Sequence, residues 1–313
     1  MQGTVDGFSY GLVTPVAAFL MAALGGALGL RCTVRSLHGG QTFKAGWLAL
    51  GAAAIGCGIW TMHFVGMMGF SVAESAISYD VPLTLVSLGV AIVVVGIGVF
   101  IVGYRGTGPA TLATAGLVTG LGVAAMHYIG MESMSLRGEF AYDPVLVVLS
   151  VLIAVVAATA ALWAAMTVRG FLPSLGASAI MGVAVTGMHY TGMSAMTVHL
   201  DGHASRTVQG GSMTTVLLPM LFGPLVLLLV AGVIVMFDPL LISGEDTWNG
   251  ARRPSARRRP QGRHTSSAPA PVAPLGPRPP SPRAGTPTRT APADRGARGR
   301  PGAVRPRRPA PPR

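Results

Sequence analysis

The sequence predicts an all-α, polytopic membrane protein with seven transmembrane helices, arranged as three parallel two-helix repeats plus one extra helix. Three observations indicate this fold class. The chain contains few charged residues, and its first 250 residues include seven long stretches without any charge. A six-residue motif also recurs three times, at nearly equal intervals and each time within one of those stretches.

Composition and hydropathy support helices that cross a membrane. Charged residues make up 11% of the 313 residues, and the mean hydropathy is +0.56, whereas soluble domains contain about 25% charged residues. About 20 apolar residues are enough to cross a bilayer as a helix, and each uncharged stretch has at least 24. The seven stretches are 7–30, 45–73, 81–104, 106–131, 144–168, 170–200 and 207–237.

The C-terminal part of the chain differs sharply from the rest. Residues 251–313 hold 16 Arg, 16 Pro and a single acid, Asp294, whereas residues 1–250 hold seven basic and ten acidic side chains. A segment of that composition cannot bury enough apolar surface to fold. We therefore expect a seven-helix membrane domain over 1–245 and a disordered, Pro/Arg-rich cytoplasmic tail over 246–313. The tail could contact anionic lipid, and no specific nucleic-acid partner is expected.

Basic residues predict the orientation in the membrane. Loops with an excess of Lys and Arg lie on the cytoplasmic side. The first, third and fifth loops carry Arg31, Arg35, Lys44, Arg105 and Arg169, whereas the opposite side has only Arg137 and Arg206. The N-terminus should therefore face outward and the C-terminal tail inward. Helices two, four and six then run outward in parallel, each paired with a returning helix, and helix one lies outside the repeats.

The repeated motif reads M-H-[FY]-x-G-M and occupies 62–67, 126–131 and 188–193. Positions i and i+4 of a helix share one face, so each His lies beside the second Met of its motif. The Gly between them leaves room for a neighbouring helix. A histidine inside a membrane needs a partner. Three such helices could present a common set of ligands to a metal: His63, Met67, His127, Met131, His189 and Met193.

The donor types indicate which metal would bind. Imidazole suits copper, zinc or iron, and thioether favours Cu(I), so we expect copper, with haem as the alternative. Zinc is less well matched because Cys and carboxylate ligands are scarce in the helices. A role for the motifs in packing alone stays open, since Met is common in apolar helices.

Other residues near the motifs are less well supported as parts of a functional site. Phe64, Tyr128 and Tyr190 could be interfacial anchors, which is the favoured interpretation. The hydroxyls of Tyr128 and Tyr190 could instead donate hydrogen bonds near the site, whereas Phe64 has no hydroxyl and cannot donate. His199 and His203 are four residues apart and could form a secondary metal site, although a solvated loop is the simpler interpretation. Cys57 lies on a different face of its helix from His63. Gly116 and Gly120 should let helix four approach a neighbour closely.

The motifs resemble the MHYT family of bacterial integral-membrane sensor domains. Residues 188–191 read Met-His-Tyr-Thr, and the other copies read Met-His-Phe-Val at 62–65 and Met-His-Tyr-Ile at 126–129. The resemblance covers roughly residues 8–240. It implies seven helices, with the motifs near the outer membrane face. It also implies that a bound metal, with copper favoured, senses oxygen, carbon monoxide or nitric oxide.

The same resemblance bears on how the protein would signal. Family members are often fused to domains that make or degrade cyclic di-GMP, whereas here a Pro/Arg-rich segment follows the helices. We therefore expect a sensor that lies in membrane lipid and acts through a separate signalling partner protein. Membrane metal transport or delivery is the alternative. The motifs of common enzymes, such as a P-loop or a Ser/His/Asp set, are not visible, so no catalysis is expected.

Overall fold

The computed structural model describes residues 4–7, 9–38, 40–199 and 211–238. Within these residues, seven helices are long and apolar enough to cross a membrane, which confirms the predicted fold class. The predicted tail, 246–313, lies outside the described residues. The helices are α1 (Val13–His38), α2 (Gly40–Met67), α3 (Val81–Arg105), α4 (Pro109–Glu132), α5 (Pro144–Thr167), α6 (Phe171–Ser194) and α7 (Leu218–Met236), which follows a short π-helix, η1 (Met213–Leu217).

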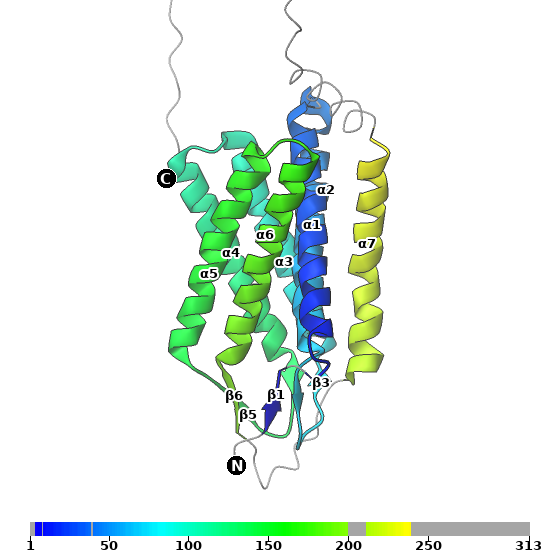
Figure 1. Ribbon diagram of the computed structural model, residues 1–313, viewed down its shortest axis with the longest axis vertical. Helices are drawn as coiled ribbons and strands as arrows, with labels where there is room; N and C mark the ends of the chain where they lie inside the picture. Colours follow the sequence, from blue (N-terminus) through cyan, green and yellow to red (C-terminus); the bar gives the residue numbers. More distant parts are fainter. Residues whose placement is uncertain (1–3, 8, 39, 200–210, 239–313) are drawn as a thin grey trace, which may run out of the picture. The chain divides into compact units, whose positions relative to one another are not determined.

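Six of the helices form a closed ring. Each of α1 to α5 packs against the next helix in the chain, and α6 returns to pack against α1. The seventh helix, α7, lies outside this ring against α1 and α2 (Figure 1). The helix outside the ring is therefore α7, whereas the sequence predicted that the first helix lies outside the repeats. The sequence repeat could not decide between them because a run of alternating helices can be divided into pairs from either end.

Short antiparallel strand pairs join the helices at one end of the bundle (Figure 1). In each pair, the first strand comes just before a helix, and the second strand comes just after the following helix of the chain. The pairs are β1 (Val5–Asp6) with β2 (Ser71–Val72), β3 (Ser78–Tyr79) with β4 (Met134–Ser135), and β5 (Glu139–Tyr142) with β6 (Met196–His199). The ring thus consists of three similar two-helix units: α1–α2, α3–α4 and α5–α6.

Two of these units begin in the same way. Asp80 caps α3 by accepting a hydrogen bond from the Leu83 N–H at 2.8 Å, and Asp143 caps α5 by accepting one from the Val145 N–H at 2.8 Å. Each helix also has a proline in its first turn, where the missing N–H would have had no helical partner. The shared start fixes where the strand ends and the helix begins in both units.

Glycine allows neighbouring helices to approach closely. A Cβ atom at Gly120 would overlap the backbone of Val155 on α5, and a Cβ atom at Gly116 would overlap the side chain of Thr159. The predicted close approach of the fourth helix to a neighbour is therefore confirmed, and the neighbour is α5. Gly25 and Gly58 make a similar contact between α1 and α2.

The outer faces of the helices are apolar. Val156 on α5, Ile180 on α6 and Phe222 on α7 are 68%, 72% and 70% exposed. Exposed apolar surface of this extent is unusual in a soluble monomer, and lipid would cover it. The predicted membrane environment is consistent with this surface.

Candidate metal centre

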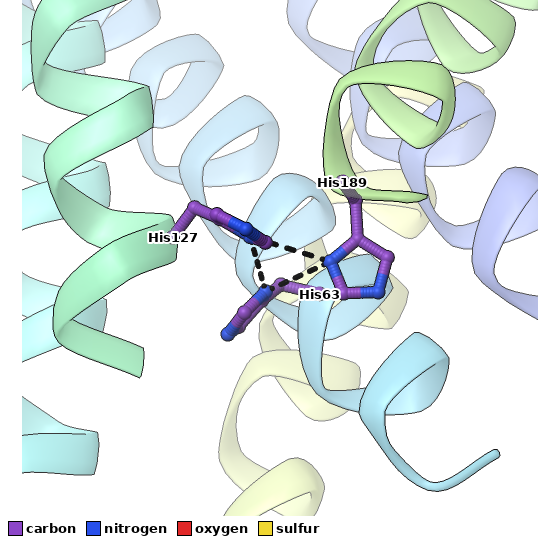
Figure 2. A group of neighbouring side chains, drawn as sticks. All are labelled: His63, His127 and His189. Atoms are coloured by element: carbon purple, nitrogen blue, oxygen red, sulfur yellow. Dashed lines mark hydrogen bonds between the residues drawn. The ribbon is translucent and has the colours of Figure 1, made fainter. Parts of the chain in front are cut away.

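The three motif histidines meet at the centre of the ring. His63 comes from α2, His127 from α4 and His189 from α6, and all three side chains are fully buried. Their Nδ1 atoms face one another (Figure 2) and form a triangle with sides of 3.0, 3.1 and 3.3 Å. The sequence prediction that the three copies lie at one depth and share a common volume is therefore correct for the histidines.

Hydrogen bonding among the three rings cannot satisfy this triangle. In a neutral imidazole, Nδ1 either donates a proton or accepts one, and a protonated ring only donates. Among three mutually adjacent Nδ1 atoms, at least two must therefore have the same role and face each other unfavourably. A cation bound by three Nδ1 lone pairs removes this conflict, because no proton is then needed between the rings.

The spacing of the three nitrogens suits a small metal ion. Nitrogens that lie about 2.0–2.1 Å from a tetrahedral metal are about 3.3–3.4 Å apart, close to the 3.0–3.3 Å observed between the Nδ1 atoms. Within the described part of the chain, these histidines form a group of His, Cys, Asp or Glu side chains that could hold a metal ion. The three residues therefore fit a resident metal.

Each motif glycine supports a histidine from another motif. A Cβ atom at Gly66 would overlap Nε2 of His189, one at Gly130 would overlap Nε2 of His63, and one at Gly192 would overlap Nε2 of His127. The three contacts run in one cyclic sense, from α2 to α6, from α6 to α4 and from α4 to α2.

This packing takes the place of a hydrogen bond. The three Nε2 atoms are buried and have no hydrogen-bond partner among the described residues. A metal-binding histidine usually has its ring held by a hydrogen bond from the second nitrogen. Here the close fit against glycine backbone holds each ring instead. The sequence indicated that the glycines leave room for a neighbour, but not which histidine occupies that room.

The aromatic residue after each histidine packs against its ring. Phe64, Tyr128 and Tyr190 lie edge-on to their preceding histidines, with ring centroids 4.7, 4.9 and 5.0 Å apart. Phe64 is fully buried, so its interpretation as an interfacial anchor is wrong. The Tyr128 hydroxyl and the Ser150 hydroxyl on α5 are 2.7 Å apart, which ties the motif of α4 to the next helix of the ring.

The methionines lie in the same region, but their role as ligands stays a prediction. Met67 and Met131 are fully buried and Met193 is partly buried against the core. The first methionines of the motifs, Met62, Met126 and Met188, are also buried. Three histidines alone suit zinc or copper, so participation of the thioethers is what would favour copper.

Two of the secondary candidates, His199 and Cys57, lie in the described part of the chain and are not in the group formed by the three histidines. His199 is exposed on the strand β6, so it does not share a helical face with His203, which lies outside the described residues. Cys57 is buried in a separate apolar cluster with Cys32 and Leu228 of α7. Both positions agree with the sequence analysis, which favoured a solvated loop for His199 and placed Cys57 on a different helical face from His63.

The fold and the site together define a class of protein: a seven-helix membrane protein with a buried three-histidine centre in its bundle. Comparison with known families identifies it further. Residues 56–115 and 120–178 each match the MHYT repeat, described as a bacterial signalling protein N-terminal repeat. Residues 56–178 therefore belong to the MHYT family, which confirms the resemblance drawn from the motifs.

Similar proteins with curated names are signalling proteins. Over 196 residues, the chain is 38% identical to the bifunctional diguanylate cyclase/cyclic di-GMP phosphodiesterase MucR of Pseudomonas aeruginosa. Over 222 residues, it is 33% identical to the cyclic di-GMP phosphodiesterase NbdA of the same organism. Over 162 residues, it is 35% identical to the signaling protein YkoW of Bacillus subtilis.

These matches cover only part of each relative. The alignments include 60%, 67% and 50% of this chain, but only 28%, 28% and 20% of MucR, NbdA and YkoW. The matched part includes the MHYT repeats of this chain. No solved structure gave a significant match.

Proposed function

We propose that this chain is a membrane sensor domain that binds a redox metal, with copper favoured, and responds to oxygen, carbon monoxide or nitric oxide. The observation that carries the proposal is the triangle of buried Nδ1 atoms from His63, His127 and His189, 3.0–3.3 Å apart. When bound, the metal would supply an open coordination position for a diatomic ligand. The three histidines would hold the metal and keep it out of water.

The sensor is favoured over the alternative of metal transport. Transport needs polar groups that continue along the bundle beyond the histidines. One helical turn deeper, at positions four residues before each histidine, the three helices carry Ile59, Val123 and Val185. These side chains offer no ligand to a metal ion. We infer that the metal is resident and not in transit, and that a separate partner protein receives the signal.

The metal site is tested by measuring the metal content and the optical spectrum of the purified protein. We expect stoichiometric copper in the wild type and none in the triple variant His63→Ala, His127→Ala, His189→Ala. His199→Ala is the matched control, because this histidine is exposed on β6, and it should keep the metal. Haem would be recognised by its intense visible absorption.

Two results would contradict the metal site: a wild-type protein without stoichiometric metal, or a triple variant that retains it.

In the copper-loaded, reduced wild type, added carbon monoxide should produce a new C–O stretching band in the infrared spectrum. A copper-loaded protein that gives no such band would contradict the sensing of a diatomic ligand, even with the metal site intact.

We further propose that the strand-bearing end of the bundle faces outward, with the N-terminus outside and residues 246–313 forming a cytoplasmic tail that contacts anionic lipid. The opposite end carries the basic residues of the α1–α2, α3–α4 and α5–α6 connections, which favours a cytoplasmic position. In intact cells, an impermeant thiol reagent should label a cysteine placed at Ala76, between β2 and β3, but not one placed at Thr107, between α3 and α4. The reverse pattern would overturn this orientation.

A further inference from the structure

A second feature of the bundle lies one helical turn deeper than the histidines. A cavity of about 50 Å³ is lined by residues of α2, α3, α4, α5 and α6. Its lining includes Ile59, Val123 and Val185, and each of these precedes a motif histidine by four residues on the same helix. Residues four apart on a helix lie on one face, so the cavity adjoins the histidine centre from the side opposite the strands.

The walls of the cavity are almost entirely apolar. Of the fifteen residues that line it, only Thr119 has a polar side-chain group, and its hydroxyl lies 3.5 Å from the Val94 carbonyl oxygen. A buried water molecule needs two to four polar partners, and apolar cavities stay dry. Water and ions are therefore poor occupants of this space.

Small side chains on α5 create the space. Five alanines of this helix contribute to one wall: Ala154, Ala157, Ala158, Ala161 and Ala165. Larger residues at these positions would fill a volume of this size. The cavity has room for about three water-sized spheres, which corresponds to a molecule of two or three atoms.

We propose that this cavity binds one molecule of a small apolar gas of the class of O₂, NO and CO, directly beside the histidine centre. Apolar cavities in proteins bind apolar molecules such as xenon, and this one accepts a diatomic gas by size and by the chemistry of its walls. Its role as a holding site for the sensed ligand rests on the proposed sensor function. The binding itself depends only on the cavity.

Crystals of the full chain under xenon pressure test the cavity without any metal. We expect a xenon peak among Ile59, Val123 and Val185 in the wild type and also in the triple His→Ala variant. Val185→Phe should fill the cavity and abolish the peak. Val183→Phe is the matched control, because Val183 lies two residues away on α6 and is 63% exposed, and it should keep the peak.

A second substitution covers the case in which Val185→Phe fails to fold. Ala158→Val adds two methyl groups to the wall that α5 contributes and should also abolish the xenon peak. In the metal-loaded protein, both cavity variants should slow the binding of carbon monoxide without changing metal content, whereas Val183→Phe should leave the rate unchanged.

The outcomes separate this inference from the proposed function. Metal that binds without a xenon peak, or ordered water in the wild-type cavity, overturns the inference and leaves the sensor in place. A xenon peak in a protein that never binds metal supports the cavity and removes the sensor. An unchanged xenon peak in Val185→Phe or Ala158→Val also overturns the inference.

Discussion

Two adjacent layers of the same three helices differ in chemistry. In one layer, α2, α4 and α6 contribute His63, His127 and His189, whose Nδ1 atoms converge. In the layer four residues deeper, the same helices contribute Ile59, Val123 and Val185 to an apolar cavity. The same three helices supply both layers, so their side chains distinguish a layer that could hold a cation from a layer with apolar walls.

The difference also shows how a polar centre is tolerated inside a bundle. Buried polar atoms are costly unless they find partners, and the triangle of Nδ1 atoms cannot be satisfied by protons alone. The deeper layer has no such requirement and can remain empty or hold a gas. We infer that the histidine layer depends on a bound cation, whereas the cavity layer depends only on the volume of its side chains.

Changing a glycine tests whether the neighbouring helices set the shape of the histidine layer. It should lower metal affinity more than changing the motif methionines does. Gly192→Ala places a Cβ atom in overlap with Nε2 of His127, so the ring must move. We expect metal affinity to fall by about 10- to 100-fold, as for other changes in residues that support a metal ligand. Metal titration of the purified protein measures this.

Gly187→Ala is the control on the same helix. A Cβ atom at Gly187 would meet nothing within 4 Å, so this variant should bind metal like the wild type. Equal metal affinities for the two glycine variants would show that the histidines are held in some other way. A xenon peak unaffected by Gly192→Ala would confirm that the disturbance stays within the histidine layer.

Changing the methionines tests whether the histidine layer also includes sulfur ligands. We expect a smaller effect on metal affinity than for Gly192→Ala. The triple variant Met67→Leu, Met131→Leu, Met193→Leu keeps apolar side chains of similar volume but removes the soft sulfur donors. If thioethers are ligands, Cu(I) affinity should fall by about tenfold while Zn(II) affinity stays unchanged, because soft sulfur favours Cu(I). Competition titrations with both ions measure the two affinities.

The methionine result also bears on the identity of the metal. Unchanged Cu(I) affinity would restrict the ligands to the three histidines, a donor set that suits zinc as well as copper. Met68→Leu is the control for changing a partly buried methionine outside the motif positions. A similar fall in Cu(I) affinity for Met68→Leu would show a general packing effect.

Much of the fold and part of the site could be predicted from the sequence. The uncharged stretches located all seven helices, because a helix in lipid needs about 20 apolar residues whatever its neighbours are. The regular spacing of the motifs indicated that the histidines share one depth. Helical spacing could not show which atoms converge, because the direction of a side chain depends on the rotation of its helix in the bundle.

Three features were beyond prediction because each depends on residues distant in the chain. The place of α7 outside the ring follows from the closing contact between α6 and α1. The support of each histidine by a glycine from another motif joins positions about 60 or more residues apart. The cavity depends on the alanines of α5, which carry no motif.

The sequence by itself determined that the described part of the chain has seven helices long and apolar enough to cross a membrane, and that three histidines lie at a common depth, because apolar length and helical period are local properties. The tertiary structure decided that three Nδ1 atoms form a triangle, that glycines hold the rings, and that an apolar cavity lies one turn deeper. These features arise where helices from different repeats pack together, and packing depends on the volume and direction of side chains that the chain brings together only when it folds.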